Sequence, residues 1–424
     1  MAKKLVIVGG GFAGLNAAKT LSNRPDLEIT LVDRKNYHLF QPLLYQVATA
    51  GLNPADIAAP IRSILSASKN VRVLQGEVSN VDVGANRIDA DFGSLDYDYL
   101  LLACGATHSY FGNDEWQANA PGLKTIANAT EIRRRILTAY EVAERIEDPE
   151  RQKKLLTFVI IGGGPTGVEL AGAIGEMSRF TLAKDFRSID AKSTRVFLME
   201  AGPRILNAFP EKLADRAARD LESLGVQIWT NSLVTNVNSD GVQVGDEQIS
   251  ANTVIWAAGV KASPLAKSLE CELDRQGRIV VDDYLNIPSN SNVFVAGDLA
   301  HAVDSGNVLP GVAPVAVQQG RYIGATILRE LNGKSRQPFR YKDKGIMATV
   351  GRNRAIVATE KWQLSGRIAW FAWLLVHIFF LTGFRNRLLV VMQWAWSYLT
   401  YRRGARLIVG HQENGSSPAR SIDC

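Results

Sequence analysis

The chain contains few of the residues that proteins use for sulfur or metal chemistry. Its 424 residues include three cysteines, Cys104, Cys271 and Cys424, and no two of them form a Cys-x-x-Cys pair. Its five histidines show no ligand-like spacing with cysteine or carboxylate residues. The sequence therefore gives no local support for a redox disulfide, and it predicts no metal site.

Long apolar runs are also scarce. The chain opens with a four-residue apolar run at 5–8, which suits a strand but is too short for the core of a signal peptide. The apolar segment 368–384 has 17 residues and contains His377, whereas a membrane-spanning helix needs about 20 apolar residues. The sequence predicts a protein that stays in the cytoplasm and does not cross a membrane.

An excess of charge is absent from most of the chain. The net charge is +6, but residues 361–424 hold eight of the 48 Lys and Arg residues and two of the 42 Asp and Glu residues, which leaves 40 of each sign in residues 1–360. Five of the eight tryptophans lie in the same final segment. This asymmetry favours an anionic surface as the partner of that segment, and the neutral remainder argues against nucleic acid as a partner.

What the chain does contain is one pattern in two copies. Residues 5–14 (LVIVGGGFAG) and 158–167 (FVIIGGGPTG) each join a short β-branched run to glycines at Gly-x-Gly-x-x-Gly spacing, and an apolar helical pattern follows each. An unbroken apolar run is typical of a parallel strand covered on both faces. Strand, glycine turn and helix form the context of a dinucleotide-binding fold. The sequence therefore predicts an α/β protein of two or three domains.

Each copy returns to a strand that ends in an acid. Asp33 lies 22 residues after Gly11, and Glu200 lies 36 residues after Gly164, so the second copy holds an insertion, assigned to 181–193. In a dinucleotide site the first glycine permits a tight turn, the second lets the backbone approach a pyrophosphate, and the third lets the helix pack on the strand, while the acid binds a ribose hydroxyl group. Glycines that serve tight turns alone are the structural alternative.

Position decides which copy is expected to bind which dinucleotide. A later strand, 292–298, ends in Asp298, which suits the ribitol end of an extended FAD on the first copy; a helix cap is the alternative role for this acid. The second copy then takes NADH rather than NADPH, because Glu200 repels a 2′-phosphate. The residues expected to bind FAD are Gly9, Gly11, Ala13, Gly14, Asp33, Arg34, Gly105 and Asp298, and those expected to bind NADH are Gly162, Gly164, Gly167, Glu200 and Gly259.

The order of these parts resembles the flavoproteins with two Rossmann-like dinucleotide-binding domains, the glutathione-reductase-like type. Residues 31–50 (LVDRKNYHLFQPLLYQVATA) resemble the type II NADH:quinone oxidoreductases of bacteria, and segments 162–172, 293–298 and 309–320 fit the same family. The resemblance implies hydride transfer from NADH to FAD and then reduction of a membrane quinone, without proton pumping. An NADH-responsive sensor similar to the apoptosis-inducing flavoproteins is the alternative from another class. The cysteine content disfavours disulfide reductases and sulfide:quinone reductases.

The resemblance also implies roles for single residues. Glu169 matches the family's acid near the nicotinamide and flavin, and stabilisation of its own helix by charge is the alternative. The family's quinone motif, Ala-Gln-x-Ala-x-Gln, reads APVAVQ at 313–318, with Pro314 in place of the first Gln. The expected catalytic residues are Glu169 and Gln318, and the expected quinone-binding residues are Gln318, Gln319, Tyr45 and Gln46.

The final segment is expected to form two amphipathic helices, 368–384 and 388–401, that lie on a membrane surface. In the second helix, Gln393 and Ser397 fall on one face, and Met392 and Trp396 fall on another. A helical hairpin packed on the domains, or a homodimer interface, is the alternative. The residues expected at the lipid headgroups are Arg367, Arg385, Arg387, Arg402 and Arg403, together with Trp370, Trp373, Trp394 and Trp396.

These expectations divide the chain into four parts. Residues 1–115 and 271–335 form the two parts of an FAD-binding domain, residues 116–270 form an NADH-binding domain, and residues 336–424 form the C-terminal region with its amphipathic helical anchor. The expected location is the cytoplasmic face of the cell membrane, to which the protein binds peripherally.

Overall fold

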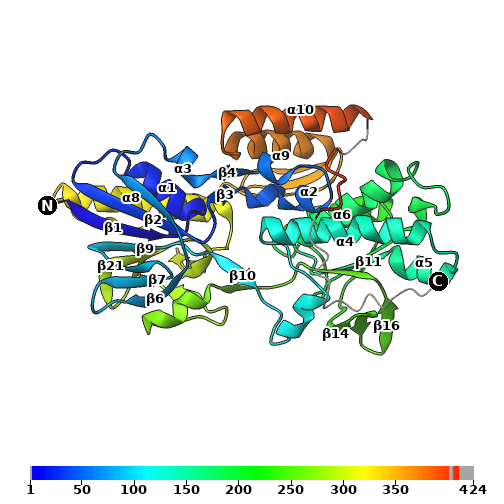
Figure 1. The fold of residues 1–424 in the computed structure, drawn as a ribbon, viewed down its shortest axis with the longest axis horizontal. Coiled ribbons are helices and arrows are strands. Elements are labelled where there is room, and N and C mark those ends of the chain that lie inside the picture. The colour runs from blue at the N-terminus through cyan, green and yellow to red at the C-terminus, as the bar shows by residue number, and fades with distance from the viewer. Residues whose placement is uncertain (1, 401–403, 410–424) are drawn as a thin grey trace.

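The structure is a computed structural model that describes residues 2–400 and 404–409. Two parallel β-sheets lie in opposite halves of an elongated molecule (Figure 1). The first sheet has the strand order β20-β21-β9-β1-β2-β5, in which only β20 and β21 run antiparallel. Its strands are β1 (Lys3–Val8), β2 (Leu27–Asp33), β5 (Val71–Gln75), β9 (Tyr99–Leu102), β20 (Asn286–Ile287) and β21 (Asn290–Val295).

The first sheet is buried on both faces, which explains its unbroken apolar strands. Leu5 and Ile7 of β1 pack against helices α1 (Phe12–Thr20) and α8 (Ala313–Leu331). Val6 and Val8 point to the other face, where they meet the core beneath an antiparallel sheet of three strands. That sheet is made of β6 (Val78–Asp82), β7 (Arg87–Ala90) and β8 (Gly93–Asp96).

The second sheet repeats this plan, so the duplication read from the sequence is confirmed in the fold. Its order is β13-β12-β11-β17, and all its neighbours run parallel. One face packs on helices, and the other packs on a three-stranded antiparallel sheet. The elements are β11 (Thr157–Ile161), β12 (Arg195–Met199), β13 (Val226–Trp229) and β17 (Thr253–Trp256), helices α4 (Ile126–Glu144), α6 (Pro165–Glu176) and α7 (Glu211–Ser223), and strands β14 (Val234–Asn238), β15 (Gly241–Val244) and β16 (Glu247–Ser250).

The C-terminal region is built onto the second half of the molecule. Strands β25 (Ile346–Gly351), β26 (Arg354–Ala358) and β27 (Gln363–Ser365) form an antiparallel sheet. Strand β25 crosses α6 so closely that a Cβ atom on Gly172 would lie 1.7 Å from the carbonyl oxygen of Val350. Glycine at this position therefore lets the sheet approach the helix that follows the second glycine turn.

Helices α9 (Gly366–Phe380) and α10 (Phe384–Thr400) lie side by side along one edge of the molecule (Figure 1). The sequence predicted the break between them near 385–387, and this prediction was wrong by a few residues. Gly383, at φ +90°, makes the turn, and the Arg387 side chain donates a hydrogen bond of 2.7 Å to the Leu381 carbonyl oxygen. Arg385 and Arg387 therefore belong to α10, and the contact of Arg387 stabilises the end of α9.

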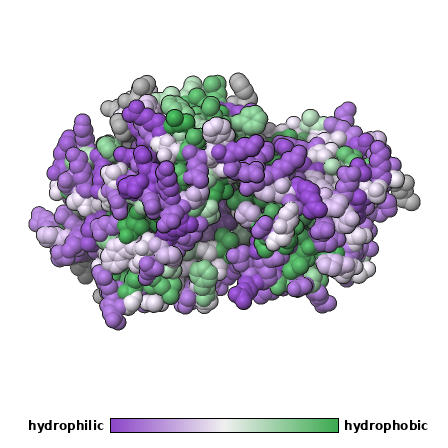
Figure 2. All heavy atoms as spheres, turned by 180° about the vertical axis from the view of Figure 1, so that it is seen from behind, coloured by the Kyte–Doolittle hydropathy of each residue, from purple (hydrophilic) through white to green (hydrophobic). Residues whose placement is uncertain are grey.

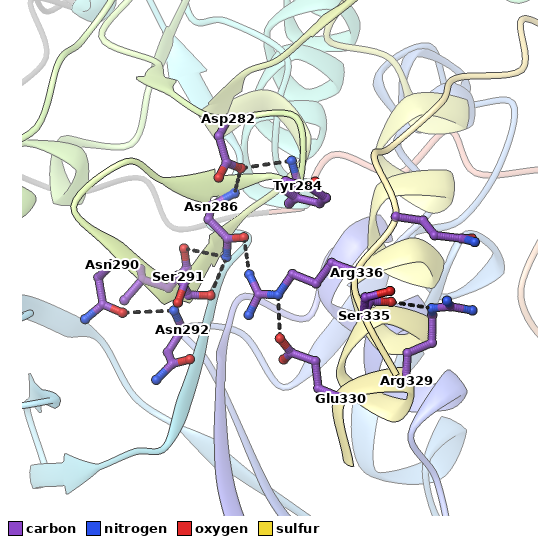
Figure 3. A network of polar contacts seen from close by, with 12 residues as sticks. Asp282, Tyr284, Asn286, Asn290, Ser291, Asn292, Arg329, Glu330, Ser335 and Arg336 are labelled. Carbon is purple, nitrogen blue, oxygen red and sulfur yellow. Dashed lines mark hydrogen bonds and ion pairs between the residues drawn. The ribbon is translucent and has the colours of Figure 1, made fainter. Parts of the chain in front are cut away.

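A partly buried polar network closes the first half of the molecule where the chain leaves α8. Arg336 donates hydrogen bonds of 2.5 Å to Glu330, near the end of α8, and to Asn286 on strand β20 (Figure 3). Its guanidinium group also lies 5.0 Å from the ring centre of Phe294 in β21. The network therefore fixes helix α8 against the edge of the first sheet.

Candidate active site

The first glycine turn has the geometry that a dinucleotide requires. Gly9 has φ +108°, and a Cβ atom on it would lie 2.3 Å from the Ala103 carbonyl oxygen. A Cβ atom on Gly14 would lie 1.9 Å from the Gly9 carbonyl oxygen, so helix and strand meet without room for a side chain. Nothing lies within 4 Å of the corresponding position on Gly11, which stands at the N-terminus of α1. The open position is where the backbone can approach a phosphate.

Asp33 ties this turn to the end of β2. Its Oδ2 accepts a hydrogen bond of 2.6 Å from the Gly10 N–H, and its Oδ1 accepts one of 2.7 Å from the Lys35 N–H. Burial raises the pKa of the Asp33 carboxyl group, and these backbone donors oppose that shift. Each carboxylate oxygen has a second lone pair, so Asp33 can also accept from a ribose hydroxyl group.

The second glycine turn reproduces the first. Gly162 has φ +111°, and a Cβ atom on Gly167 would lie 1.9 Å from the Gly162 carbonyl oxygen. Gly164, at the N-terminus of α6, faces open space as Gly11 does. Glu200 accepts hydrogen bonds of 2.7 Å from the N–H groups of Gly163 and Gly202. Both turns therefore fit a dinucleotide pyrophosphate.

The other four residues predicted for the first site have different surroundings. Gly105 has φ +70° and faces open space, and the Asp298 carboxylate lies 3.6 Å from the Lys124 ammonium group. Ala13 is buried where α1 crosses α8, and Arg34 is an exposed side chain paired with Glu77 at 3.4 Å. Lys124 was not identified from the sequence, because nothing around it marks a site.

His38 is a second residue that sequence reasoning did not place. The buried ring lies 3.0 Å from the Gly10 carbonyl oxygen through Nδ1. A carbonyl oxygen can only accept, so Nδ1 carries the proton of the ring. Burial lowers the pKa of the imidazole, which favours its neutral form. Neutral His38 and Asp33 therefore hold Gly10 from its two sides.

Burial raises the pKa of the Cys104 thiol to about 12, so the group stays a thiol at neutral pH. Nowhere in residues 2–400 and 404–409 do three or more histidine, cysteine or carboxylate side chains gather in a way that could hold a metal ion.

A pocket of about 120 Å³ lies between the second glycine unit and the C-terminal helices. Its wall combines residues from four distant parts of the chain: the segment after β3 (Tyr37–Leu39), helix α6, strand β25, and the two C-terminal helices. The residues that line the pocket include Tyr45, Gln46, Glu169, Arg352, Trp373 and Trp394. The structure thus brings three predicted site residues, Tyr45, Gln46 and Glu169, to one place.

Glu169 stands on α6, two residues after the last glycine of the second turn. Burial raises the pKa of its carboxyl group to about 8, and a hydrogen bond from the Thr349 backbone N–H opposes the shift. At neutral pH the group therefore carries a proton, although a carboxyl group in water does not. A protonated carboxyl group in a pocket can donate that proton to a ligand.

Gln318 and Gln319 do not line this pocket. The Gln318 amide makes two hydrogen bonds of 3.0 Å with the backbone of Lys342. Gln319 is buried and accepts a hydrogen bond of 2.7 Å from the Gly297 N–H, directly before Asp298. The position of Gln319 thus connects it with the Gly-Asp turn of the first half.

The tryptophans of the final segment do not all face outward as predicted. Trp373 is buried, with its ring centre 4.2 Å from that of His377. The Trp394 indole N–H donates a hydrogen bond of 2.7 Å to the Gln46 side-chain oxygen. Trp396 is 61% exposed, as expected, and Arg402 and Arg403 lie outside the described residues. The prediction was wrong for Trp373 and Trp394 because helical spacing alone does not tell which face meets the protein.

Comparisons with known proteins agree on the family. Residues 3–320 match the pyridine nucleotide-disulphide oxidoreductase family. Two Mycobacterium tuberculosis proteins, the type II NADH:quinone oxidoreductases Ndh and NdhA, are 44% and 43% identical to this chain; the alignments cover 96% of this chain and 91% and 89% of those proteins.

Solved structures show the same fold. The structure of NDH2 from Plasmodium falciparum in complex with NADH matches with a TM-score of 0.86 at 20% identity, covering 97% of this chain and 100% of that one. The sulfide:quinone oxidoreductase of Aquifex aeolicus matches with a TM-score of 0.72 at 19% identity, over 91% and 92% of the two chains. Because more than one family shares this fold, the sequence relatives decide to which family the chain belongs. This chain belongs to the type II NADH:quinone oxidoreductases, flavoproteins that oxidise NADH and reduce a quinone.

Proposed function

We propose that the first glycine turn holds FAD, that the second holds NADH, and that the pocket beside Glu169 receives the quinone. In this assignment residues 1–115 and 271–335 bind FAD, and residues 116–270 bind NADH. The flavin, when bound, supplies the hydride chemistry that side chains cannot. The observation that carries the proposal is the position of Glu169, whose helix begins at the second turn and whose carboxyl group lines the pocket.

The protein residues then have distinct tasks. Asp33 and Glu200 would accept hydrogen bonds from the ribose hydroxyl groups of the two dinucleotides. Gln319 holds the Gly297–Asp298 turn, at which Asp298 would bind the FAD ribitol. Reduction of a quinone to a quinol consumes two protons, and the protonated Glu169 carboxyl group can deliver one to a quinone oxygen. Tyr45 and Gln46 offer hydrogen bonds to the quinone ring. A direct quinone contact by Gln318 remains a prediction.

The reaction can be tested on the purified flavoprotein without oxygen. NADH is expected to bleach the flavin absorbance, and a soluble quinone analogue is expected to restore it at a rate that supports turnover. A flavin that NADH reduces but quinone fails to reoxidise would favour the NADH-responsive sensor instead.

We further propose that α9 and α10 seat the protein on the cytoplasmic face of the cell membrane. Helix α10 exposes several apolar residues: Met392 is 50% exposed and Trp396 61%, whereas Gln393 and Ser397 are half-buried and Val390 is buried. Apolar side chains gather over these helices on the surface (Figure 2). An outward apolar face rimmed by the exposed cations Arg367 and Arg385 matches a lipid headgroup layer. No helix among the described residues is both long and apolar enough to cross a membrane.

Three substitutions on α9 test this proposal without disturbing the core. Ile368, Leu375 and Phe379 are 66–70% exposed, so changing all three to Glu should leave folding and flavin content intact. Sedimentation with anionic lipid vesicles is expected to fall at least about tenfold, because each buried apolar side chain contributes about 1.5–3 kcal/mol. The control is Leu233→Glu, an equally exposed residue on the second half. Unchanged sedimentation together with a loss of dimer would identify the face as a homodimer interface.

The cofactor choice of the second site depends on Glu200. A neutral Gln keeps one of the two backbone hydrogen bonds and removes the charge that repels a 2′-phosphate. The ratio of kcat/KM for NADPH to that for NADH is expected to rise about tenfold or more, measured with ferricyanide as acceptor. The control is Glu222→Gln, an exposed acid on α7. An unchanged ratio would mean that Glu200 does not contact the ribose.

A further inference from the structure

We propose that Trp394 is a positioning residue for quinone reduction: through Gln46 it sets the orientation of the Tyr45 hydroxyl group in the pocket. This inference rests on the proposed quinone site. It gives helix α10 a task in the reaction that is separate from contact with lipid.

Two hydrogen bonds carry the inference. The Trp394 Nε1–H donates to Gln46 Oε1 at 2.7 Å, and Gln46 Nε2 donates to the Tyr45 hydroxyl oxygen at 2.9 Å. An indole nitrogen can only donate, so the amide atom that faces it must be the oxygen. The Gln46 amide therefore has one possible orientation, in which its NH₂ group faces Tyr45. Without Trp394, nothing in this pair of contacts would prevent the amide from turning over.

The arrangement joins parts of the chain 348 residues apart. Gln46 and Tyr45 lie on the short helix α2 (Leu44–Ala48) of the first half, and Trp394 lies on α10. The Trp394 ring centre is 5.5 Å from that of the buried Trp373 on α9, so packing fixes the indole as well as its hydrogen bond. All four side chains line the pocket that Glu169 also lines.

The direction of the hydrogen bonds determines what Tyr45 can do. The Tyr45 oxygen accepts from Gln46, so its own proton points away from Gln46. Hydrogen bonds in a row polarise one another, and an oxygen that accepts is a better donor. Tyr45 is thereby prepared to donate to a quinone oxygen, which gains negative charge as it is reduced.

The test uses Trp394→Phe, which keeps an aromatic ring and removes the N–H group. With a soluble quinone analogue, kcat/KM is expected to fall about tenfold, the effect of a hydrogen bond to a group that gains charge. Flavin content and NADH oxidation with ferricyanide are expected to stay within about twofold, because the aromatic ring is kept. The matched control is Trp396→Phe, on the same helix with its side chain outward, which should leave both activities unchanged.

A second pair of variants separates positioning from packing. In Gln46→Glu the new carboxylate still accepts from Trp394 but also accepts from Tyr45, so the proton of Tyr45 is drawn away from the pocket and quinone kcat/KM should fall as in Trp394→Phe. In a Tyr45→Phe background, Trp394→Phe should cause little further loss, because both changes remove the same interaction.

The outcomes distinguish this inference from the proposed function. A wild-type protein that does not reduce quinone overturns the proposed function. A wild-type protein that reduces quinone, with Trp394→Phe equally active or with fully additive losses in the Tyr45→Phe background, overturns only the role of Trp394.

Discussion

Gly167→Ala is expected to yield a protein that still contains FAD but that NADH no longer reduces, whereas Gly14→Ala is expected to yield a protein without FAD. In each case the new methyl group would lie 1.9 Å from a backbone oxygen in the corresponding glycine turn. No rotation of a side chain relieves such a contact, so helix and strand must separate. Misplaced atoms of about 1 Å already cost about a hundredfold in rate, and the pyrophosphate site is displaced by at least that much.

Two measurements check this pair. The flavin absorbance of the purified proteins reports FAD, and stopped-flow reduction by NADH reports the second site. Gly84→Ala is a fitting control, because its new Cβ atom would make only an ordinary contact, 3.5 Å from the Asp82 carboxylate. If Gly167→Ala lost FAD and Gly14→Ala kept it, the assignment of the two dinucleotides would have to be exchanged.

Glu169→Gln is expected to lower quinone turnover about a hundredfold or more below pH 8, because a positioned general acid contributes about 10²–10⁴ in rate. The wild-type rate should fall as the pH rises above about 8, where the carboxyl group loses its proton. The variant should be slow and show no such fall. Flavin reduction by NADH, followed separately, tells whether Glu169 acts on the quinone or on the nicotinamide. A variant whose turnover keeps the wild-type pH profile would exclude Glu169 as the proton donor.

The same residue has a consequence for stability. In the unfolded chain Glu169 loses its proton near its ordinary pKa of 4.5, but in the folded protein it does so near 8. Between these values the folded state binds more protons than the unfolded state, so stability decreases as the pH rises through that range. The decrease amounts to at most about 5 kcal/mol. Glu169→Gln should remove this part of the pH dependence in thermal unfolding, and Glu222→Gln should not.

Much of the fold could be predicted from the sequence because its rules are local. The glycine at position 9 needs a positive φ, the one at position 14 needs a bare Cα, and both needs recur at 162 and 167. Successive side chains of a strand such as 5–8 point to opposite faces of the sheet, and both faces are buried. This explains why the strand carries no polar residue. These constraints act within one strand, turn and helix, and the sequence displays them in order.

The pocket could be predicted only in part, because it is assembled from distant segments. Tyr45, Gln46 and Glu169 were found through a family resemblance, whereas Lys124 next to Asp298 follows only from the packing of the two halves. The inward position of Trp394 was missed for a related reason. Helical spacing alone does not tell which face of α10 meets the protein, and here the inward face carries polar residues as well as Val390 and Trp394.

The two faces of helix α10 meet different surroundings and therefore select for different side chains. A lipid surface selects for hydrophobicity and has no fixed shape, so Met392 and Trp396 can be exchanged among apolar residues over evolutionary time. Trp394 and Ser397 face a pocket with fixed neighbours, where the backbone of Ser397 accepts a hydrogen bond of 3.4 Å from Arg352. Along α10, we therefore expect the inward positions, polar ones included, to vary least among relatives and the apolar outer positions to vary most. In a helix that faces water, the outer positions that vary most are polar.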